Sequence, residues 1–382
     1  MGCEVCRQKE PEATFLFQKI ETETNEKKNM NSTERKEDYE KFLSIFDNNI
    51  QAFGKYFEQD FNTLIPQKII EYVKSNPLRI NPELLKDLDT YKIKPIEFQN
   101  GNVYEGGWNR ELKLEGKGKY FLKKDRVFAE GVWHDGNLIF ARVFTANEDD
   151  FDIYEGEIKN SNYNGKGKLI LPDGQIYEGD FVNGEKTGYC KIIFPDETVY
   201  EGQIDNGQLN GKGKMIWKNG YEYEGDFDKN KLSGNGILKS PKGDVYNGEF
   251  SDNLFNGKGI YTYNNGDSYE GQFLYGAKKG KGIYKCLNYY EYEGDWDNNL
   301  PCGNGKLSTW DKNGIIKSRW RNGQIMEEPI YEKGNETDFM QINLNIIPNE
   351  GMIYITDLSN LEISGNQSTQ FKLGTLPSFL DD

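Results

Sequence analysis

The residues near the start of the sequence that could carry covalent chemistry are a glycine and two cysteines, in MGCEVC. Removal of Met1 exposes Gly2, and Cys3 beside it stands at a common palmitoylation position of doubly acylated proteins. One myristoyl chain binds a membrane only marginally, and a second acyl chain makes the binding stable. We therefore predict lipidation at Gly2 and Cys3, with Cys6 as a further candidate. Because Cys6 stands where Ser or Thr is preferred, an unmodified start is the alternative.

Other chemistry has little support in these residue types. Cys3 and Cys6 have the spacing of a metal or redox pair, but the sequence has no second C-x-x-C and only one histidine, His134. Local motifs suggest no Ser-His-Asp or Cys-His pairing, no phosphate-binding glycine loop with its lysine and no H-E-x-x-H. The sequence therefore predicts a protein that is not an enzyme and that uses no metal or cofactor.

Charge and composition narrow the class of partner and the compartment. The net charge is −15, distributed as −3 over residues 1–99, −4 over 100–323 and −8 over 324–382. An acidic chain is unsuited to a phosphate backbone, which argues against nucleic acid. With no long apolar run, no secretory leader and only five scattered cysteines, we expect a soluble body in a reducing compartment, at the cytoplasmic face of a membrane.

The middle of the chain repeats a Y-E-G motif. From Tyr154 onward the repeat length is 23 residues, six times in succession, and about nine repeats plus a degenerate terminal one fill residues 98–323. A repeat of this length predicts an array of supersecondary units that are stable only when stacked. The repeat tyrosines are Tyr104, Tyr154, Tyr177, Tyr200, Tyr223, Tyr246, Tyr269 and Tyr292.

Each repeat has the pattern of two strands. After Tyr177, aromatic and glycine residues alternate with acids, which is the period of a strand with one apolar face. A G-x-G pair such as Gly165 and Gly167 precedes a second alternating run, and Asn265-Gly266 is typical of a hairpin turn. Glycines on the tyrosine face would let large rings lie over bare backbone. The sequence predicts an all-β repeat array, a single elongated antiparallel β-meander of hairpins.

The pattern Y-E-G-x-[FW]-x-x-G-x-x-x-G-x-G resembles the MORN repeat (membrane occupation and recognition nexus) over residues 98–323. The resemblance implies an all-β rod or groove used for tethering and scaffolding, as in junctophilins, apicomplexan and trypanosomatid cytoskeletal proteins and radial-spoke head proteins. The sequence departs from the pattern at three places. Ala129 stands where a repeat tyrosine is expected, Cys190 stands where a glycine is expected, and residues 147–152 form an acidic insertion.

Residues 31–95 predict a helical segment that caps the first repeats. Asn31 and Glu34 mark a helix start, and apolar residues then recur at three- and four-residue steps up to Phe57. Pro66 and Pro82 favour the starts of a second and a third helix. A partner-binding or self-associating role for these helices is the alternative.

The two ends of the chain have other compositions. Residues 1–30 predict a flexible segment that carries the lipid anchor. Residues 324–382 predict an acidic C-terminal segment, in which only Met340 to Ile347 alternates between apolar and polar residues. We assign this segment no chemistry from the sequence.

The leading functional prediction is a non-enzymatic, membrane-tethered scaffold or adaptor whose repeat groove binds a protein partner. Its aromatic side chains have two candidate roles, packing of the sheet and contact with the partner. The predicted groove residues are Tyr177, Phe181, Tyr200, Trp217, Tyr223, Phe227, Tyr246 and Tyr269.

Two alternatives stay open from the sequence. The first is a phosphoinositide-binding repeat module, in which lysines of the G-K-G segments contact anionic head groups although neighbouring acids would offset them. The second is an axonemal or cytoskeletal structural subunit, for which the acylation motif would be incidental. The sequence leaves the oligomeric state open. The lysines of the first alternative are Lys166, Lys168, Lys212, Lys214 and Lys258.

Overall fold

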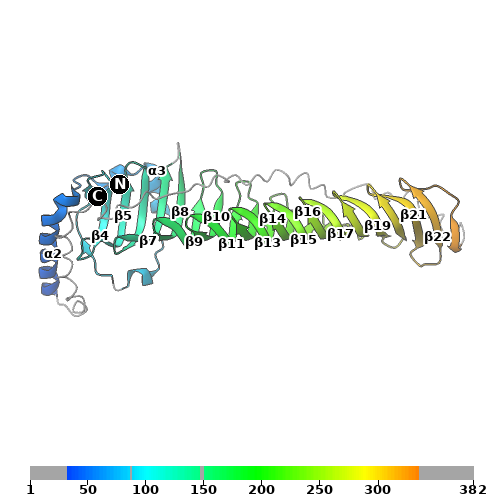
Figure 1. Ribbon diagram of the computed structural model, residues 1–382, viewed down its shortest axis with the longest axis horizontal. Helices are drawn as coiled ribbons and strands as arrows, with labels where there is room; N and C mark the ends of the chain where they lie inside the picture. The colour runs from blue at the N-terminus through cyan, green and yellow to red at the C-terminus, as the bar shows by residue number, and fades with distance from the viewer. Residues whose placement is uncertain (1–31, 87, 147–149, 335–382) are drawn as a thin grey trace, which may run out of the picture. The chain divides into compact units, whose positions relative to one another are not determined.

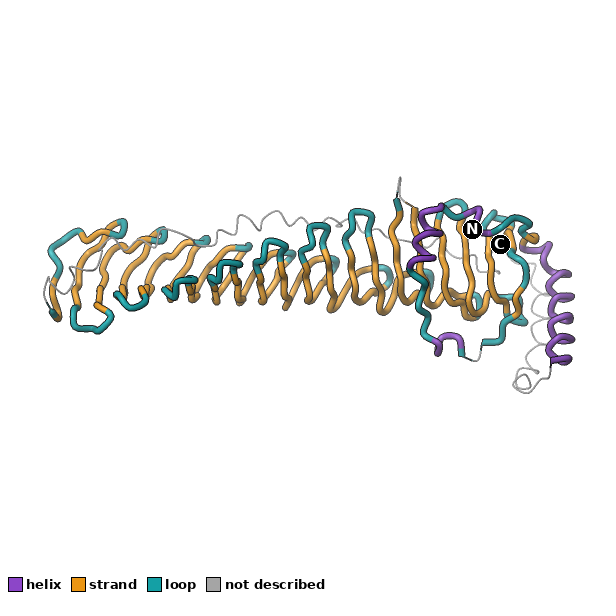
Figure 2. The backbone as a smooth tube through the Cα atoms, turned by 180° about the vertical axis from the view of Figure 1, so that it is seen from behind, coloured by secondary structure: helices purple, strands orange, loops and turns teal. Residues whose placement is uncertain are grey.

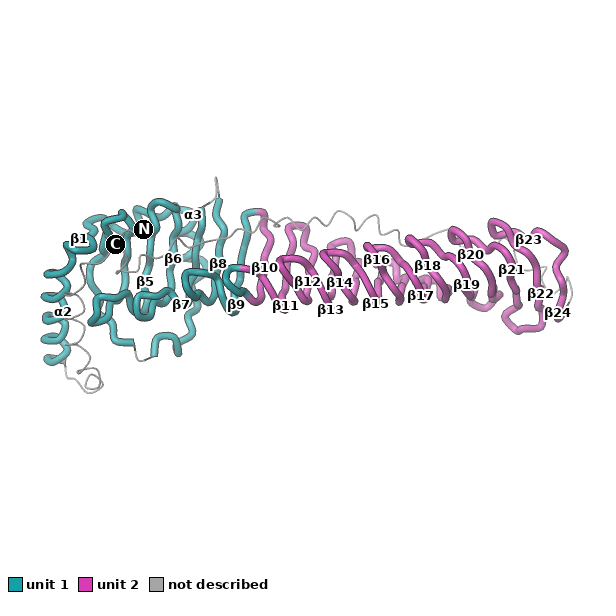
Figure 3. Tube along the Cα trace, viewed as in Figure 1, with its two compact units in different colours: residues 1–172, 181–184, 370–382 teal, residues 173–180, 185–369 magenta. Residues whose placement is uncertain are grey.

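A computed structural model describes residues 32–86, 88–146 and 150–334. The chain forms two compact units, coloured separately in Figure 3. Among the described residues, unit 1 holds those up to 172 together with 181–184, and unit 2 holds 173–180 and those from 185 onward. Each unit is described by itself below.

Unit 1 combines helices with an antiparallel sheet. From β4 to β9 each strand pairs with the next along the chain, while β1 and β4 both pair with β3, and β2 pairs with β4. The elements are α2 (Ser32–Phe53), β1 (Gly54–Tyr56), η2 (Phe61–Leu64), α3 (Gln67–Ser75), η3 (Pro82–Leu85), β2 (Tyr91–Lys92), β3 (Ile96–Phe98), β4 (Val103–Trp108), β5 (Leu114–Leu122), β6 (Val127–His134), β7 (Asn137–Ala146), β8 (Phe151–Lys159) and β9 (Asn162–Ile170).

The apolar face of α2 packs against the first strands of unit 1 (Figure 1). The Phe46 ring lies edge-on to Trp108 of β4 with centroids 5.0 Å apart, and Phe42 stacks on Tyr91 at 4.1 Å. The predicted apolar periodicity continued to Phe57, but α2 ends at Phe53 because the next three residues form β1. This helix covers an end of the sheet that would otherwise expose apolar side chains.

The second helix covers one face of the strands that follow. Helix α3 begins after Pro66, as expected from the sequence, and Figure 2 shows it in front of the strands of unit 1. Its Ile69 joins Phe128 and Phe144 in a buried apolar cluster. The predicted third helix is only the four-residue 3-10 turn η3, since the backbone is already extended at Lys86.

A buried ion cluster joins α3 to the sheet of unit 1. The Arg142 side chain is 4% exposed, and its guanidinium donates to Glu155 at 2.6 and 3.0 Å and to Glu130 at 3.3 Å. It also donates to the carbonyl oxygen of Asn76, just after α3. Burial raises the pKa of Glu130, and the Arg142 charge opposes that shift. The cluster satisfies charges that would be costly to bury alone.

Unit 2 is a meander of hairpins, and the predicted all-β antiparallel array preceded by a helical segment is confirmed. Each strand from β11 to β23 pairs antiparallel with its neighbour along the chain, and β24 pairs with β22. Strand β10 (Ile176–Val182) contains the division between units. The others are β11 (Glu185–Ile193), β12 (Val199–Asp205), β13 (Gln208–Ile216), β14 (Glu222–Asp228), β15 (Lys231–Lys239), β16 (Val245–Ser251), β17 (Leu254–Thr262), β18 (Ser268–Leu274), β19 (Ala277–Cys286), β20 (Tyr290–Asp297), β21 (Leu300–Thr309), β22 (Ile315–Arg321), β23 (Gln324–Ile325) and β24 (Ile330–Lys333).

The repeat glycines make room for the repeat tyrosines, as the sequence predicts. A Cβ added to Gly225 would lie 2.4 Å from the hydroxyl oxygen of Tyr223, and one added to Gly236 would lie 2.4 Å from the same ring. The Tyr223 hydroxyl donates to the Asp226 carbonyl at 2.8 Å. Gly234 has a positive φ of 53° at a bulge between β14 and β15, where a side chain would be strained.

The buried rings of successive hairpins form a ladder through unit 2. Tyr223 contacts Phe227 of its own strand at 5.2 Å and Phe250 of the next repeat at 5.1 Å, both edge-to-face. The same arrangement recurs at Tyr246, with Phe250 and Phe273 both at 5.1 Å. Edge-to-face pairs add to the stabilisation from burial. Each repeat is thus held by the ring of the following one.

Candidate binding groove

The face of unit 2 opposite the tyrosines carries a continuous row of outward side chains. In Y-E-G the tyrosine and glycine point to the buried face and the acid to the other. The strand register aligns Ile237 with Asn247, Asn247 with Ile260, and Ile260 with Glu270. The row continues, in order of pairing, through Ile283, Glu293, Lys306, Lys317 and Ile330.

A second row lies one pleat away on the same face. Lys258 is opposite Gln272, and Asn304 is opposite Arg319. Lys281 pairs with Asp295 across the strands at 2.7 Å. The Arg319 guanidinium also lies 3.4 Å from Glu327. Opposite charges on neighbouring strands stabilise this surface modestly, because such exposed pairs are screened by water.

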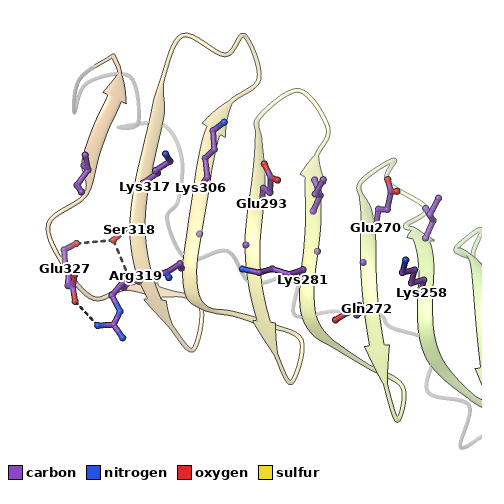
Figure 4. Close-up of a pocket in the computed structure, with 18 of the residues that line it drawn as sticks. Lys258, Glu270, Gln272, Lys281, Glu293, Lys306, Lys317, Ser318, Arg319 and Glu327 are labelled. Carbon is purple, nitrogen blue, oxygen red and sulfur yellow. Dashed lines mark hydrogen bonds and ion pairs between the residues drawn. The ribbon is translucent and has the colours of Figure 1, made fainter.

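The two rows enclose a groove of about 1050 Å³ on strands β17 to β22. Figure 4 shows side chains of successive strands directed into it, with Glu327 bonded to Ser318 and Arg319 at one end. Its lining includes Ile260, Ile283 and Ile330, of which Ile260 is 43% and Ile330 70% exposed. Five cations and four acids line the rest: Lys258, Lys281, Lys306, Lys317, Arg319, Glu270, Glu293, Glu327 and Glu328.

This groove differs from the rest of the chain in charge and polarity. Its charged lining residues sum to a small positive value, whereas the full chain carries −15. Isoleucines that alternate with glutamates along one row, beside the lysines of the second row, suit a polypeptide segment with an apolar side and polar flanks. The arrangement offers binding surface, and no group in it is placed as a nucleophile beside a base.

The eight aromatic residues predicted for the groove lie on the buried face instead. None is more than 6% exposed. Tyr177 lies over Gly179 in unit 2, and Phe181 lies edge-on to Tyr154 in unit 1. Their burial favours the packing role over contact with a partner, and partner contact by these rings stays a prediction. The remaining members are equally enclosed: Tyr200, Trp217, Tyr223, Phe227, Tyr246 and Tyr269.

The five lysines of the lipid-binding alternative are distributed over both units. Lys166 and Lys168 lie on β9 of unit 1, with Lys168 opposite Glu155. In unit 2, Lys212 pairs with Asp226 at 2.6 Å, and Lys214 lies between Glu201 and Glu224 in the register. Lys258 lines the groove. Acids beside these lysines reduce the field that an anionic head group would meet.

The predicted lipidation sites, Gly2, Cys3 and Cys6, lie outside the described residues. In the part of the chain that the structure describes, no helix is long and apolar enough to cross a bilayer. The same part holds no cluster of three or more His, Cys, Asp or Glu that could bind a metal ion.

Sequence reasoning missed the groove isoleucines and one buried lysine. Ile237, Ile260 and Ile283 recur every 23 residues. This repeat is visible in the sequence, but the prediction of groove residues used only the aromatic positions. Lys278 is 0% exposed, its ammonium 5.1 to 5.3 Å from the rings of four aromatic residues. Burial lowers its pKa to about 7, and Asp267 nearby opposes the shift.

Comparison with known families identifies the repeats. Seven segments between residues 154 and 309 match the MORN repeat: 154–176, 177–199, 200–220, 223–245, 246–268, 269–288 and 292–309. The MORN repeat is a non-enzymatic repeat module. The groove is therefore built on these repeats and on the strands that directly follow them. No curated protein sequence matches the chain significantly.

Two solved structures share a weak likeness with this chain. The SAS-4 (dCPAP) TCP domain of Drosophila melanogaster, in complex with a proline-rich motif of Ana2, is 13% identical with a TM-score of 0.27, over 42% of this chain and 87% of that one. The G-box domain of the microcephaly protein CPAP is 13% identical with a TM-score of 0.19, over 61% of this chain and 99% of that one. These scores carry no functional argument.

Proposed function

We propose that this chain is a non-enzymatic scaffold whose groove on β17 to β22 binds a segment of a partner protein. The observation that carries the proposal is the groove itself, in which isoleucines alternate with glutamates along one row of side chains. An exposed apolar patch rimmed by polar groups is typical of an interaction surface. A sheet braced by a buried aromatic ladder provides the rigid support that such a surface needs.

In the full proposal, acyl chains on Gly2 and Cys3 hold the scaffold at the cytoplasmic face of a membrane. The support is the sequence MGC, since two acyl chains give stable residence where one does not. The groove would then present its partner close to that membrane. The groove and the anchor are separate claims, and each has its own test.

Two groove substitutions test partner binding. Ile260→Asp with Ile283→Asp places two carboxylates on the groove floor, and we expect at least a tenfold loss of co-purified partner, since buried unpaired charges oppose binding. Ile237→Asp is the matched control. Ile237 lies in the same register row and is 38% exposed, but it is not part of the groove lining. Equal loss in both variants, or no loss in either, would contradict the proposal.

Acylation is tested with Gly2→Ala in cells fed clickable myristate and palmitate. We expect wild-type protein to be labelled by both and recovered with membranes, and the variant to lose labelling and membrane retention together. If the variant stays with membranes, the repeats themselves localise the protein. Salt-sensitive liposome binding without acyl chains would then support the phosphoinositide alternative, and microtubule co-fractionation would support the cytoskeletal one.

A further inference from the structure

The described chain leaves the sheet beside the groove. Ile330 is the first residue of β24 and also lines the groove, paired with Lys317. Strand β24 ends at Lys333, and Gly334 follows with a φ of 81°. The sequence then continues for 48 residues, to Asp382. Any segment shortly after Gly334 is therefore tethered next to the groove.

The sequence after Gly334 contains one segment whose composition suits the groove. In Met340–Ile347, MQINLNII, apolar residues alternate with Gln and Asn, so an extended conformation has one apolar side. The charges also complement each other: Glu336 and Asp338 precede this segment, and residues 335–382 contain seven acids and one lysine, while the groove's charged residues sum to a small positive value. Where the chain departs, Lys306 lies opposite Lys317, and Lys317 pairs with Glu332 at 2.5 Å.

The dimensions agree as well. Strands β17 to β22 and the adjoining β24, whose Ile330 lines the groove, span six inter-strand spacings, about 29 Å in total, and eight extended residues span about 26 Å. The five residues between Gly334 and Met340 can bridge up to about 17 Å. A linker of a few residues gives an effective concentration of about 1 mM. At that concentration, a segment with a dissociation constant of about 0.1 mM would occupy the groove roughly nine-tenths of the time.

We propose that Met340–Ile347 of the same chain occupies the groove and competes with the external partner. The segment lies across β17 to β22 with Met340, Ile342, Leu344 and Ile346 toward the isoleucine floor. The inference rests on the proposed binding role of the groove, and it adds an internal competitor that controls access. A partner must displace this segment, or it binds after another factor has removed the segment from the groove.

The test is photo-cross-linking in the purified full chain, with p-benzoylphenylalanine in place of Ile283. We expect a monomeric adduct between position 283 and residues 338–348, mapped by mass spectrometry and independent of protein concentration. The same probe at Tyr189 is the positional control. Tyr189 is 62% exposed on the same face at β11 of unit 2, outside the groove lining, and should not reach the segment.

Two paired variants test which side of the segment faces the groove. Ile342→Asp with Leu344→Asp should lower the cross-link at least tenfold and raise partner capture by about the same factor. Asn343→Asp with Asn345→Asp adds the same charge to the opposite side and should change neither by more than about twofold.

Several results would overturn the inference. Adducts found only in dimers would indicate that a second copy occupies the groove. Adducts to another part of the chain, the absence of any adduct, or an equal loss of cross-linking in both paired variants would also contradict the inference. If the adduct fails while Ile260→Asp with Ile283→Asp still releases the partner, the internal competitor is wrong and the proposed function stands. If both fail, neither stands.

Discussion

Lys278 gives the sharpest prediction about how the array is held together. Equivalent positions of the preceding repeats, Leu209, Leu232 and Phe255, are apolar and at most 3% exposed, whereas Lys278 is buried to the same degree and carries an amine. Its ammonium donates to the Tyr263 hydroxyl at 2.7 Å. Replacing it by leucine, the residue of two sister repeats, removes a costly buried charge without creating a large cavity.

The magnitude follows from the pKa of the lysine, which burial lowers from 10.5 to about 7. At about 1.4 kcal/mol per pKa unit, burying the charged form of Lys278 costs about 5 kcal/mol of folding free energy. At pH 7, near the lowered pKa, about 4 kcal/mol of this cost remains. Leaving the Tyr263 hydroxyl without its partner offsets about 1 to 3 kcal/mol. We therefore expect Lys278→Leu to stabilise unit 2 by about 2 kcal/mol at pH 7.

The sign of the pH dependence is fixed by the direction of the shift. Between pH 7 and pH 10.5 the unfolded chain binds more protons at Lys278 than the folded chain, so wild-type stability rises with pH in this window. The destabilisation that Lys278 causes therefore falls by about 2 kcal/mol between pH 7 and pH 9. The leucine variant lacks this pH dependence.

Urea unfolding of wild type and variant, followed by far-ultraviolet circular dichroism at pH 7, 8 and 9, measures this difference. The advantage of the variant should shrink with rising pH. A pH-independent difference, or a variant less stable than wild type at pH 7, would refute the reasoning. The double variant Lys278→Leu with Tyr263→Phe removes the orphaned hydroxyl and should be more stable than Lys278→Leu alone.

Three further substitutions test the packing by the same unfolding measurement. Gly225→Ala puts a Cβ 2.4 Å from the Tyr223 hydroxyl oxygen and 2.5 Å from Gly236 Cα, and should cost about 1 to 3 kcal/mol; an unchanged midpoint would contradict the ring-over-glycine packing. Tyr246→Phe loses the hydrogen bond to the Glu249 carbonyl and should lower the free energy of unfolding by about 1 kcal/mol. Phe250→Ala in the ladder should lower it by about 3 to 5 kcal/mol, and equal losses would refute this ranking. Arg142→Ala strands Glu130 and Glu155 in unit 1 and should cost about 3 to 5 kcal/mol, while a loss below about 1 kcal/mol would show that the cluster is not essential.

The repeat period made most of the fold predictable. Alternation after Tyr177 and turns such as Asn265-Gly266 specify strands and hairpins locally, and a fixed repeat length lets one correct unit define the rest. The role of the glycines was predictable because a large ring needs bare backbone beside it. The length of η3 was not predictable, because a proline at the start of a helix does not indicate where that helix ends.

The candidate site was harder to predict than the fold. Period two assigns aromatic residues and acids to opposite faces, but it does not say which of the two faces binds a partner. We named the rings as groove residues with sheet packing as their other candidate role, and the structure buries Tyr246 and exposes Ile260. A repeated exposed isoleucine was visible in the sequence, but its meaning depends on the open surface around it. Lys278 at an apolar repeat position was also visible, and only the structure shows its surroundings.

The central claim is that the groove on β17 to β22 binds a partner protein. The most direct measurement places p-benzoylphenylalanine at Ile260 in cells, irradiates them and identifies any second polypeptide bound covalently to the chain. We expect one specific partner cross-linked from position 260 and at least tenfold less from the same probe at Ile237, in the same row but outside the groove lining. Equal cross-linking from both positions, or no second polypeptide from either, would contradict the account.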